Sequence, residues 1–113
     1  MTYDEKLCRA VEKLGLTIEP GLDTSAGGEY VVYSYTRGGE LWGDDAPCIE
    51  HRHWTMIYVA PLTMDRAQLR LELIQTIFDL FEAWPSEDPY SDAEVQRWVY
   101  QFDTIGGIDD GEA

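Results

Sequence analysis

Residues 49–84 read IEHRHWTMIYVAPLTMDRAQLRLELIQTIFDLFEAW, a strand pattern followed at once by a helix pattern. Residues 49–60 place apolar side chains on both faces of an extended chain, which predicts a central strand that is covered on both sides. Pro61 ends this strand. Thr63 or Asp65 then caps a long helix, which we expect to run to the end of the quoted stretch.

This predicted helix is apolar around much of its circumference. Its apolar residues cover an arc of about 200°, whereas contact with one sheet needs only roughly 100°. Arg70 also falls inside the arc. The helix therefore either lies deep in the domain or buries a second surface against another subunit, and the small size of the domain favours the second reading. Phe81 and Trp84, near the end of the helix, are candidate contacts in such an interface.

The sequence before the central strand begins with a helix and a loop. Residues 2–14 carry an apolar stripe at helical spacing. Thr2 and Glu5 form a capping box at the start of this helix, and Gly15 supplies its stop. Residues 16–28 are rich in glycine, proline and aspartate, which predicts a loop with one short extended piece.

Two further strand segments follow that loop. Tyrosine, valine and threonine crowd residues 29–36, which predicts a strand. Gly38 and Gly39 predict a two-residue hairpin turn, after which residues 40–42 start the return strand. The segment GDDAP at residues 43–47 then breaks the pattern.

The C-terminal part of the sequence predicts one more strand. Residues 85–92 are acidic and contain two prolines, which predicts a loop. Residues 95–105 alternate aromatic and polar side chains, as expected for a strand with an exposed face or a place at the sheet edge. Gly106 and Gly107 lead into the acidic residues 108–113, which we expect to form a mobile tail.

These elements together predict the fold class. Their order is α-β-β-β-α-β, which is typical of an α+β fold with two helices packed on an antiparallel mixed sheet of about four strands. A chain of 113 residues is long enough for one domain with a buried core. We assign that single α+β domain to residues 1–107.

The charge of the chain excludes several kinds of partner. It has 22 acidic residues against 8 lysines and arginines, a net charge of -14. Such a surface repels phosphates, so neither a direct grip on nucleic acid nor binding to a membrane is expected. Two cysteines make no disulfide framework and no signal peptide is visible, which favours the cytosol. Solubility alone also explains the charge.

Cys48, His51 and His53 are the side chains best suited to bind a metal ion. His51 and His53 share one face of an extended strand, whereas Cys48 would lie on the other. A further ligand would have to come from Asp44 or Asp45, and the spacing matches no recurring zinc pattern. Two strand histidines near the sheet end explain the pattern without a metal, so we expect neither a metal nor another cofactor.

The remaining patterns do not favour catalysis, and we expect no catalytic residues. No serine lies in a G-x-S-x-G elbow, and the glycine pairs lack the spacings that bind phosphate. Asp44 and Asp45 are typical turn residues. The chain is therefore not expected to be an enzyme. Its short length, its acidity and its widely apolar helix favour a protein that assembles.

Residues 29–81 resemble small tail-completion and tail-terminator proteins of siphophages and prophages from Gram-positive bacteria. Three features carry the resemblance: the tyrosine-rich strand at residues 30–36, the GDDAP segment before a long strand, and Pro61 followed at once by a helix. The order and spacing of these features support the resemblance more than any one motif does. The similarity extends over roughly residues 7–107.

The resemblance implies a virion structural protein that is present in the host cytoplasm during assembly. Members of this family form rings, commonly hexamers, that stop growth of the tail tube and join it to the head–tail connector protein. DNA passes through the centre of such a ring, where an acidic bore would let it slide. Candidate subunit contacts here are Trp42, Asp44, Asp45 and Pro47, because aromatic residues beside turns often anchor interfaces.

Two other functions remain open from the sequence. An acidic binding module could imitate DNA and block a nucleic-acid-binding protein, which predicts a stripe of carboxylates on one face. A tail ring instead predicts acids spread over loops and the tail. A small metal-dependent enzyme would be built on Cys48, His51 and His53 with Asp44 or Asp45.

Overall fold

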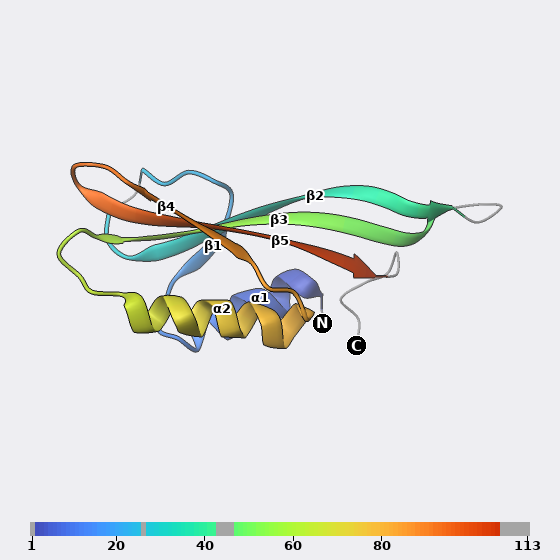
Figure 1. Ribbon diagram of the computed structural model, residues 1–113, viewed down its shortest axis with the longest axis horizontal. Coiled ribbons are helices and arrows are strands. Elements are labelled where there is room, and N and C mark those ends of the chain that lie inside the picture. Colours follow the sequence, from blue (N-terminus) through green and yellow to red (C-terminus); the bar gives the residue numbers. More distant parts are fainter. Residues whose placement is uncertain (1, 26, 43–46, 107–113) are drawn as a thin grey trace.

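The computed structural model describes residues 2–25, 27–42 and 47–106 (Figure 1). The elements are α1 (Tyr3–Glu12), β1 (Ile18–Pro20), β2 (Tyr30–Trp42), β3 (Pro47–Pro61), α2 (Ala67–Phe81), β4 (Ser86–Ser91) and β5 (Val95–Gly106). The strands form one sheet in the order β1-β2-β3-β5-β4, with β1 parallel to β2 and the other neighbours antiparallel. The predicted α+β class is confirmed, with a mixed sheet of five strands.

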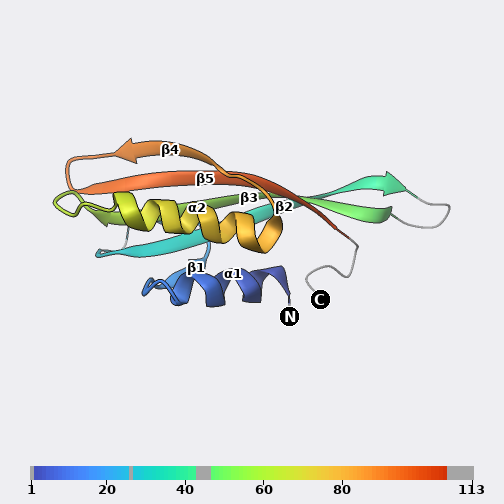
Figure 2. The ribbon, with the colours of Figure 1, turned by 60° about the horizontal axis from the view of Figure 1, so that its bottom comes forward.

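Both helices pack on the same face of the sheet (Figures 1 and 2). The main core lies between them and this face. Helix α1 contributes Leu7 and Val11 to it, and α2 contributes Leu73 and Ile77. The strands contribute mostly large side chains: Val31, Tyr33, Trp54, Met56, Tyr58, Ala60, Trp98, Tyr100 and Phe102. We call the other side of the sheet the open face.

Helix α1 begins where the sequence predicted. Thr2 is its N-cap, and the Thr2 side chain accepts a hydrogen bond from the Glu5 backbone N–H at 3.3 Å. This bond satisfies one of the N–H groups that a helix start leaves without a partner. Gly15, with a φ of 87°, ends the turn that follows the helix.

Strand β3 is the central strand, as predicted, but it is covered on both sides only near its end. Tyr58, Val59 and Ala60 are consecutive and fully buried. The loop between β1 and β2 crosses the open face at this end, where Arg97 Nε donates to Thr24 Oγ1 at 3.1 Å. From His51 to Ile57, buried residues alternate with partly exposed ones, because no element of the described chain covers their open face.

The hairpin turn predicted at Gly38 and Gly39 is wrong. Strand β2 continues through both glycines, with Gly38 opposite His51 and Gly39 opposite Glu50. The register of this ladder shifts just after Gly39. A glycine pair fits such an irregular strand as readily as it fits a turn, since a bulge also needs an unhindered backbone.

The prediction of an acidic loop at residues 85–92 is also wrong. It contains strand β4, which pairs along β5 from Ser86 opposite Gln101 to Ser91 opposite Gln96. Strand β5 is therefore an interior strand at this end and not the sheet edge. Its predicted exposed face is confirmed, because Gln101 is exposed while the neighbouring Tyr100 is buried.

Helix α2 is shorter than predicted at both ends. It starts at Ala67, whose backbone N–H donates to Asp65 Oδ1 at 3.1 Å, so Asp65 helps to cap it without being its N-cap residue. It ends at Phe81, because Glu82 adopts a left-handed conformation with a φ of 55°. The Glu82 N–H closes the last turn on the Phe78 carbonyl at 2.7 Å.

One end of the sheet extends beyond both helices (Figures 1 and 2). The molecule measures 54 × 24 × 21 Å, and the long hairpin of β2 and β3 lies along its longest dimension. We call the extended part the arm and define it as residues 36–42 of β2, 47–53 of β3 and 103–106 of β5. The rest of the described chain is the body.

Candidate functional site

A row of aromatic residues joins the arm to the body. Tyr35, Trp54 and Phe102 lie opposite one another on three neighbouring strands. Trp54 has no exposed surface, and its ring lies 4.6 Å from that of Tyr35 and 5.8 Å from that of Phe102. Its indole N–H donates to Thr104 Oγ1 at 3.0 Å. Phe81, at the end of α2, stacks on Trp54 at 5.6 Å and so holds this row against the helices.

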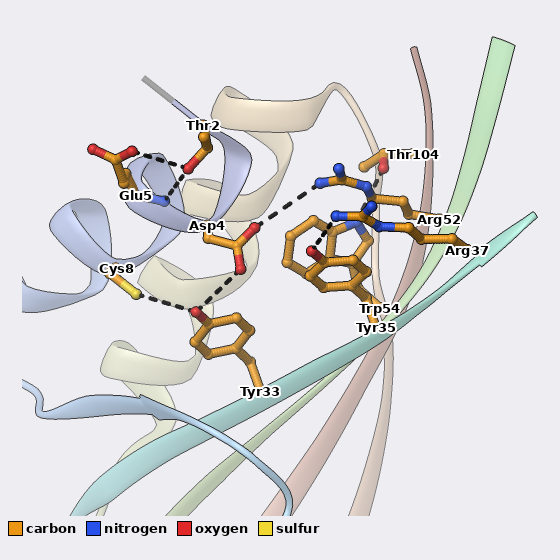
Figure 3. Close-up of polar contacts among 10 residues, drawn as sticks. All are labelled: Thr2, Asp4, Glu5, Cys8, Tyr33, Tyr35, Arg37, Arg52, Trp54 and Thr104. Carbon is orange, nitrogen blue, oxygen red and sulfur yellow. Dashed lines mark hydrogen bonds and ion pairs between the residues drawn. The ribbon is translucent and has the colours of Figure 1, made fainter. Parts of the chain in front are cut away.

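Arg52 is buried directly beside this row (Figure 3). Its guanidinium lies 4.7 Å from the centre of the Tyr35 ring and 5.5 Å from that of Tyr3. Its Nη1 is 3.9 Å from Asp4 Oδ1. A buried guanidinium needs an opposite charge and gains from aromatic faces, and helix α1 supplies here the charge of Asp4 and one of the rings, that of Tyr3. Arg52 therefore ties the arm's central strand to the first helix.

Asp4 continues this network toward a cysteine (Figure 3). The Tyr33 hydroxyl donates to Asp4 Oδ2 at 3.3 Å, and Cys8 Sγ donates to the Tyr33 hydroxyl at 3.8 Å. Burial raises the pKa of the Tyr33 hydroxyl and of the Cys8 thiol. Cys8 therefore stays protonated at neutral pH, which makes it a poor nucleophile.

On the open face of the arm, two histidines share one carboxylate. His53 Nδ1 lies 2.7 Å and His51 Nε2 lies 3.1 Å from the same oxygen, Asp103 Oδ1. The bond from His53 lowers the pKa of Asp103 most, and His51 adds to the effect. The prediction that both histidines share a face is confirmed. Their partner Asp103 was not found from the sequence, because it lies 50 residues from His53.

The weak metal candidate named from the sequence, Cys48 with His51 and His53, gains no support from the described residues. Among them, no group of three histidine, cysteine, aspartate or glutamate side chains is placed to hold a metal ion. Both histidine rings instead turn toward one carboxylate oxygen. The other candidate ligands, Asp44, Asp45 and the side chain of Cys48, lie outside the described residues.

The predicted interface residues fall in two places. Trp42 and Pro47 are opposite each other at the ends of β2 and β3, although only their backbones belong to the described part of the chain. Phe81 is partly buried in the aromatic row at the base of the arm. Trp84 lies just beyond α2, is 62% exposed and stacks on Phe78 at 4.2 Å.

Helix α2 has an apolar outer surface in addition to its buried one. Only Leu73 and Ile77 are fully buried within the helix. Leu71 is 62% exposed, and Ile74 and Phe78 follow it at helical spacing and remain partly exposed. We call Leu71, Ile74, Phe78 and Trp84 the outer stripe. The helix thus does not lie deep in the domain.

Arg70, which interrupts the apolar arc of α2, forms an ion pair with a carboxylate of β4. It donates two hydrogen bonds to Glu87, at 2.6 and 3.0 Å, and stacks 5.0 Å from the Trp98 ring. Tyr100 donates to the same carboxylate at 2.5 Å. The Arg70 guanidinium holds the pKa of Glu87 below its usual value against the opposing effect of burial. Sequence reasoning missed this pair because it assigned Glu87 to a loop.

The surface of the described residues includes two open hollows. One, of about 270 Å³, lies over the start of β2, in the body. Its lining includes three carboxylates, those of Glu19, Asp23 and Glu29. Glu29 is already engaged, since it accepts from Tyr58 and pairs with Arg66. The other hollow, of about 280 Å³, lies where the end of α2 meets β5. The residues that line it are Tyr3, Asp79, Leu80, Phe81, Glu82, Thr104 and Ile105.

Comparison with known proteins does not add to this description. The chain matches no protein-family model and no curated protein. Within residues 2–25, 27–42 and 47–106, no helix is long and apolar enough to cross a membrane.

Proposed function

We propose that this chain is a structural subunit of a phage or prophage tail, which forms a ring that terminates the tail tube and joins it to the head–tail connector. The arm carries this proposal. Its three strands extend beyond both helices after the row of Tyr35, Trp54 and Phe102. Apart from the contact of Arg52 with α1, the described part of the arm extends past both helices, and a thin sheet of this kind gains stability from contact with other chains.

The outer stripe supports the same proposal with a second surface. Leu71 and Trp84 are each 62% exposed, although large apolar side chains are costly to leave in water. This stripe lies on the body, whereas the arm projects from it. A subunit with two separate contact surfaces can join its neighbours in a ring through one of them and bind the tail tube through the other.

The placement of acidic residues favours a ring over a DNA-mimicking inhibitor. The described carboxylates are spread over both helices, three strands and the connecting loops. Five of them also contact basic side chains: Asp4, Glu29, Glu87, Asp92 and Asp103. A DNA mimic needs a row of unpaired carboxylates along one face. Spread charge instead keeps the surface from holding DNA that passes through the ring.

Electron microscopy of growing tail tubes tests this proposal. Tail-tube protein from the same phage or prophage genome is polymerised with and without the chain. We expect a ring at one end of each tube and shorter tubes, because a terminator blocks addition of further subunits. Bare tube ends and unchanged tube lengths at saturating concentrations of the chain would overturn the proposal.

Two matched variants identify the surface that binds the tube or the neighbour. Trp84→Ser removes an aromatic residue of the outer stripe, and we expect it to lower the fraction of capped tubes about tenfold. Tyr90→Ser removes an aromatic residue that is similarly exposed, at 65%, but lies on β4 away from the stripe. This control should cap tubes normally.

A further inference from the structure

The arm has two sheet edges that no described strand covers. Strand β1 pairs with β2 only as far as Tyr33, and β4 pairs with β5 only as far as Gln101. In residues 2–25, 27–42 and 47–106, the sheet contains no further strand beyond β1 or β4. Past these two points the sheet therefore consists of β2, β3 and β5, with an edge on the β2 side and another on the β5 side.

The backbone of β5 turns hydrogen-bonding groups outward at this edge. The carbonyls of Val95 and Gln101 point toward β4, since they accept from Asp92 N–H at 3.0 Å and from Ser86 Oγ at 3.4 Å. Every second residue of a regular strand points its backbone groups the same way. The ladder between β3 and β5 has no register shift, so the alternation continues to Asp103 and Ile105.

The edge of β2 has the same property. Val31 N–H donates to the Thr17 carbonyl at 2.7 Å, and the Tyr33 carbonyl accepts from Gly21 N–H at 2.8 Å. Both groups point away from β3. By the same alternation, the backbone groups of Tyr35 also point away from β3, at the place where β1 has already ended.

The outer strands of the body are protected against pairing, whereas the β5 edge of the arm is not. Strand β1 has only three residues and ends in Pro20, and β4 carries Asp88 and Pro89. Short strands, charges and prolines are the usual means of preventing edge-to-edge association. By contrast, residues 102–106 of β5 read FDTIG, without proline. The carboxylate of Asp103 is engaged by His51 and His53, and Ile105 is 65% exposed.

Space for a neighbouring strand exists beside this edge. The hollow of about 280 Å³ at the end of α2 is lined by Thr104 and Ile105 of β5 and by Phe81 and Glu82. A strand added to the sheet next to β5 projects alternate side chains toward the helix face. Those side chains would enter the hollow, whereas the side chains on the other face of the added strand would lie beside Ile105, which shares the open face with Asp103.

We infer that the arms of neighbouring copies pair edge to edge, with the β5 edge of one copy at Asp103 and Ile105 against the β2 edge of the next copy from Tyr35 onward. This inference rests on the proposed ring. The occupant is a second copy because each arm carries both halves of the contact. Within one copy, β2 and β5 are both antiparallel to β3 and therefore run in the same direction. Rotation of a second copy about an axis along the strands places its β2 beside β5 of the first copy, with the two strands parallel. Repetition of this contact between two different edges gives a ring when the rotation between copies closes.

Residue-resolved hydrogen exchange tests the backbone contact directly. In the free chain, the amides of Asp103 and Ile105 should exchange at nearly unprotected rates, because their N–H groups face away from β3. In the ring, we expect both amides to become protected. The amide of Thr104, which points toward β3, should be protected in both states and serves as the internal control.

A proline variant tests the same contact independently. Ile105→Pro removes an outward N–H and leaves the ladder to β3 unchanged, so self-association should weaken about tenfold or more for each contact. Ile105→Val keeps the N–H and should assemble normally. Circular dichroism of the free variants shows whether both fold, and hydrogen exchange of the unaltered chain remains decisive if the proline variant does not.

Each other outcome separates this inference from the proposed function. Rings on tube ends with rapid exchange at Asp103 and Ile105, or with normal assembly of Ile105→Pro, would overturn edge pairing and leave the proposed function standing. Protection in the free chain that disappears when residues 107–113 are removed would show that the chain's own tail occupies the edge, and this also overturns the inference. The absence of any ring would overturn both.

Discussion

Two arginines show how single residues connect separate elements of this protein. Arg52 links β3 to α1 through Asp4, and Arg70 links α2 to β4 through Glu87. Each guanidinium also lies over an aromatic ring. Because a charge in a largely apolar environment is tolerated only with an opposite charge and hydrogen bonds, each pair fixes how its two elements meet.

The pair of Arg70 and Glu87 should contribute measurably to stability. Arg70→Met leaves the partly buried Glu87 carboxylate without its main partner, and we expect the free energy of unfolding to fall by about 1–3 kcal/mol. Urea denaturation measures this change. Arg9→Met, at an exposed position of α1, is the control and should change stability by no more than about 0.5 kcal/mol. Equal losses in both variants would contradict this role of the pair.

The same pair predicts how stability depends on pH. Arg70 lowers the pKa of Glu87 in the folded protein below its ordinary value of 4.5. A group with a lowered folded pKa stabilises the protein fully above its ordinary pKa, and this contribution is lost as pH falls through the folded value. The unfolding free energy of the wild type should therefore decline below about pH 4.5, and more steeply than that of Arg70→Met. Parallel curves for the two proteins would exclude this source of acid sensitivity.

At the scale of elements, the sequence predicted those whose signals are local. Helix α1 has its cap and stripe within a few residues, and β3, Pro61 and α2 follow one another in a continuous pattern. Strand β4 could not be found in this way. Its residues SEDPYS are polar because one face is exposed and Glu87 is paired with Arg70, so only its ladder to β5 makes it a strand.

The candidate site was likewise predictable only where its signals are local in the sequence. Alternation along a strand placed His51 and His53 on one face. Their partner Asp103 depends on the register between β3 and β5, which joins residues 50 positions apart. The arm itself was missed because Gly38 and Gly39 suggested a turn in the middle of β2. A glycine pair does not distinguish a turn from a strand until the pairing of its neighbours is known.

The base of the arm should depend on the hydrogen bond from Trp54 to Thr104. Trp54→Phe removes the donor and buried volume, and we expect a loss of about 2–4 kcal/mol in unfolding free energy. Thr104→Val removes the acceptor and should cost about 1–2 kcal/mol. The double variant should lose less than the sum of the two, because neither unpaired group then remains. Additive losses in a double-mutant cycle would show that the bond does not couple β3 to β5.

For the whole molecule, the contact surfaces of its elongated shape favour assembly, whereas its large negative charge opposes assembly. The arm and the outer stripe offer two separate surfaces for contact with other chains. A net charge of -14 on each copy makes the copies repel one another. Assembly of free subunits is therefore disfavoured until a partner or added salt offsets the repulsion.

This repulsion predicts an unusual salt dependence. Self-association should tighten as salt rises from roughly 0.02 M to roughly 0.3 M, because the Debye length shortens from about 20 Å to less than 8 Å. Sedimentation velocity at several salt concentrations measures the effect. Weaker association at higher salt would mean that contacts between opposite charges, and not edge pairing and apolar burial, hold the copies together.

The measurement that bears most directly on the proposed ring is the particle mass from light scattering. It is made across a concentration series of the full chain, alone and with short pieces of purified tail tube. The ring proposal predicts one discrete oligomer, in solution or bound to tube ends, with a mass that stays constant as concentration rises further. A strict monomer that ignores the tubes at every concentration would contradict it.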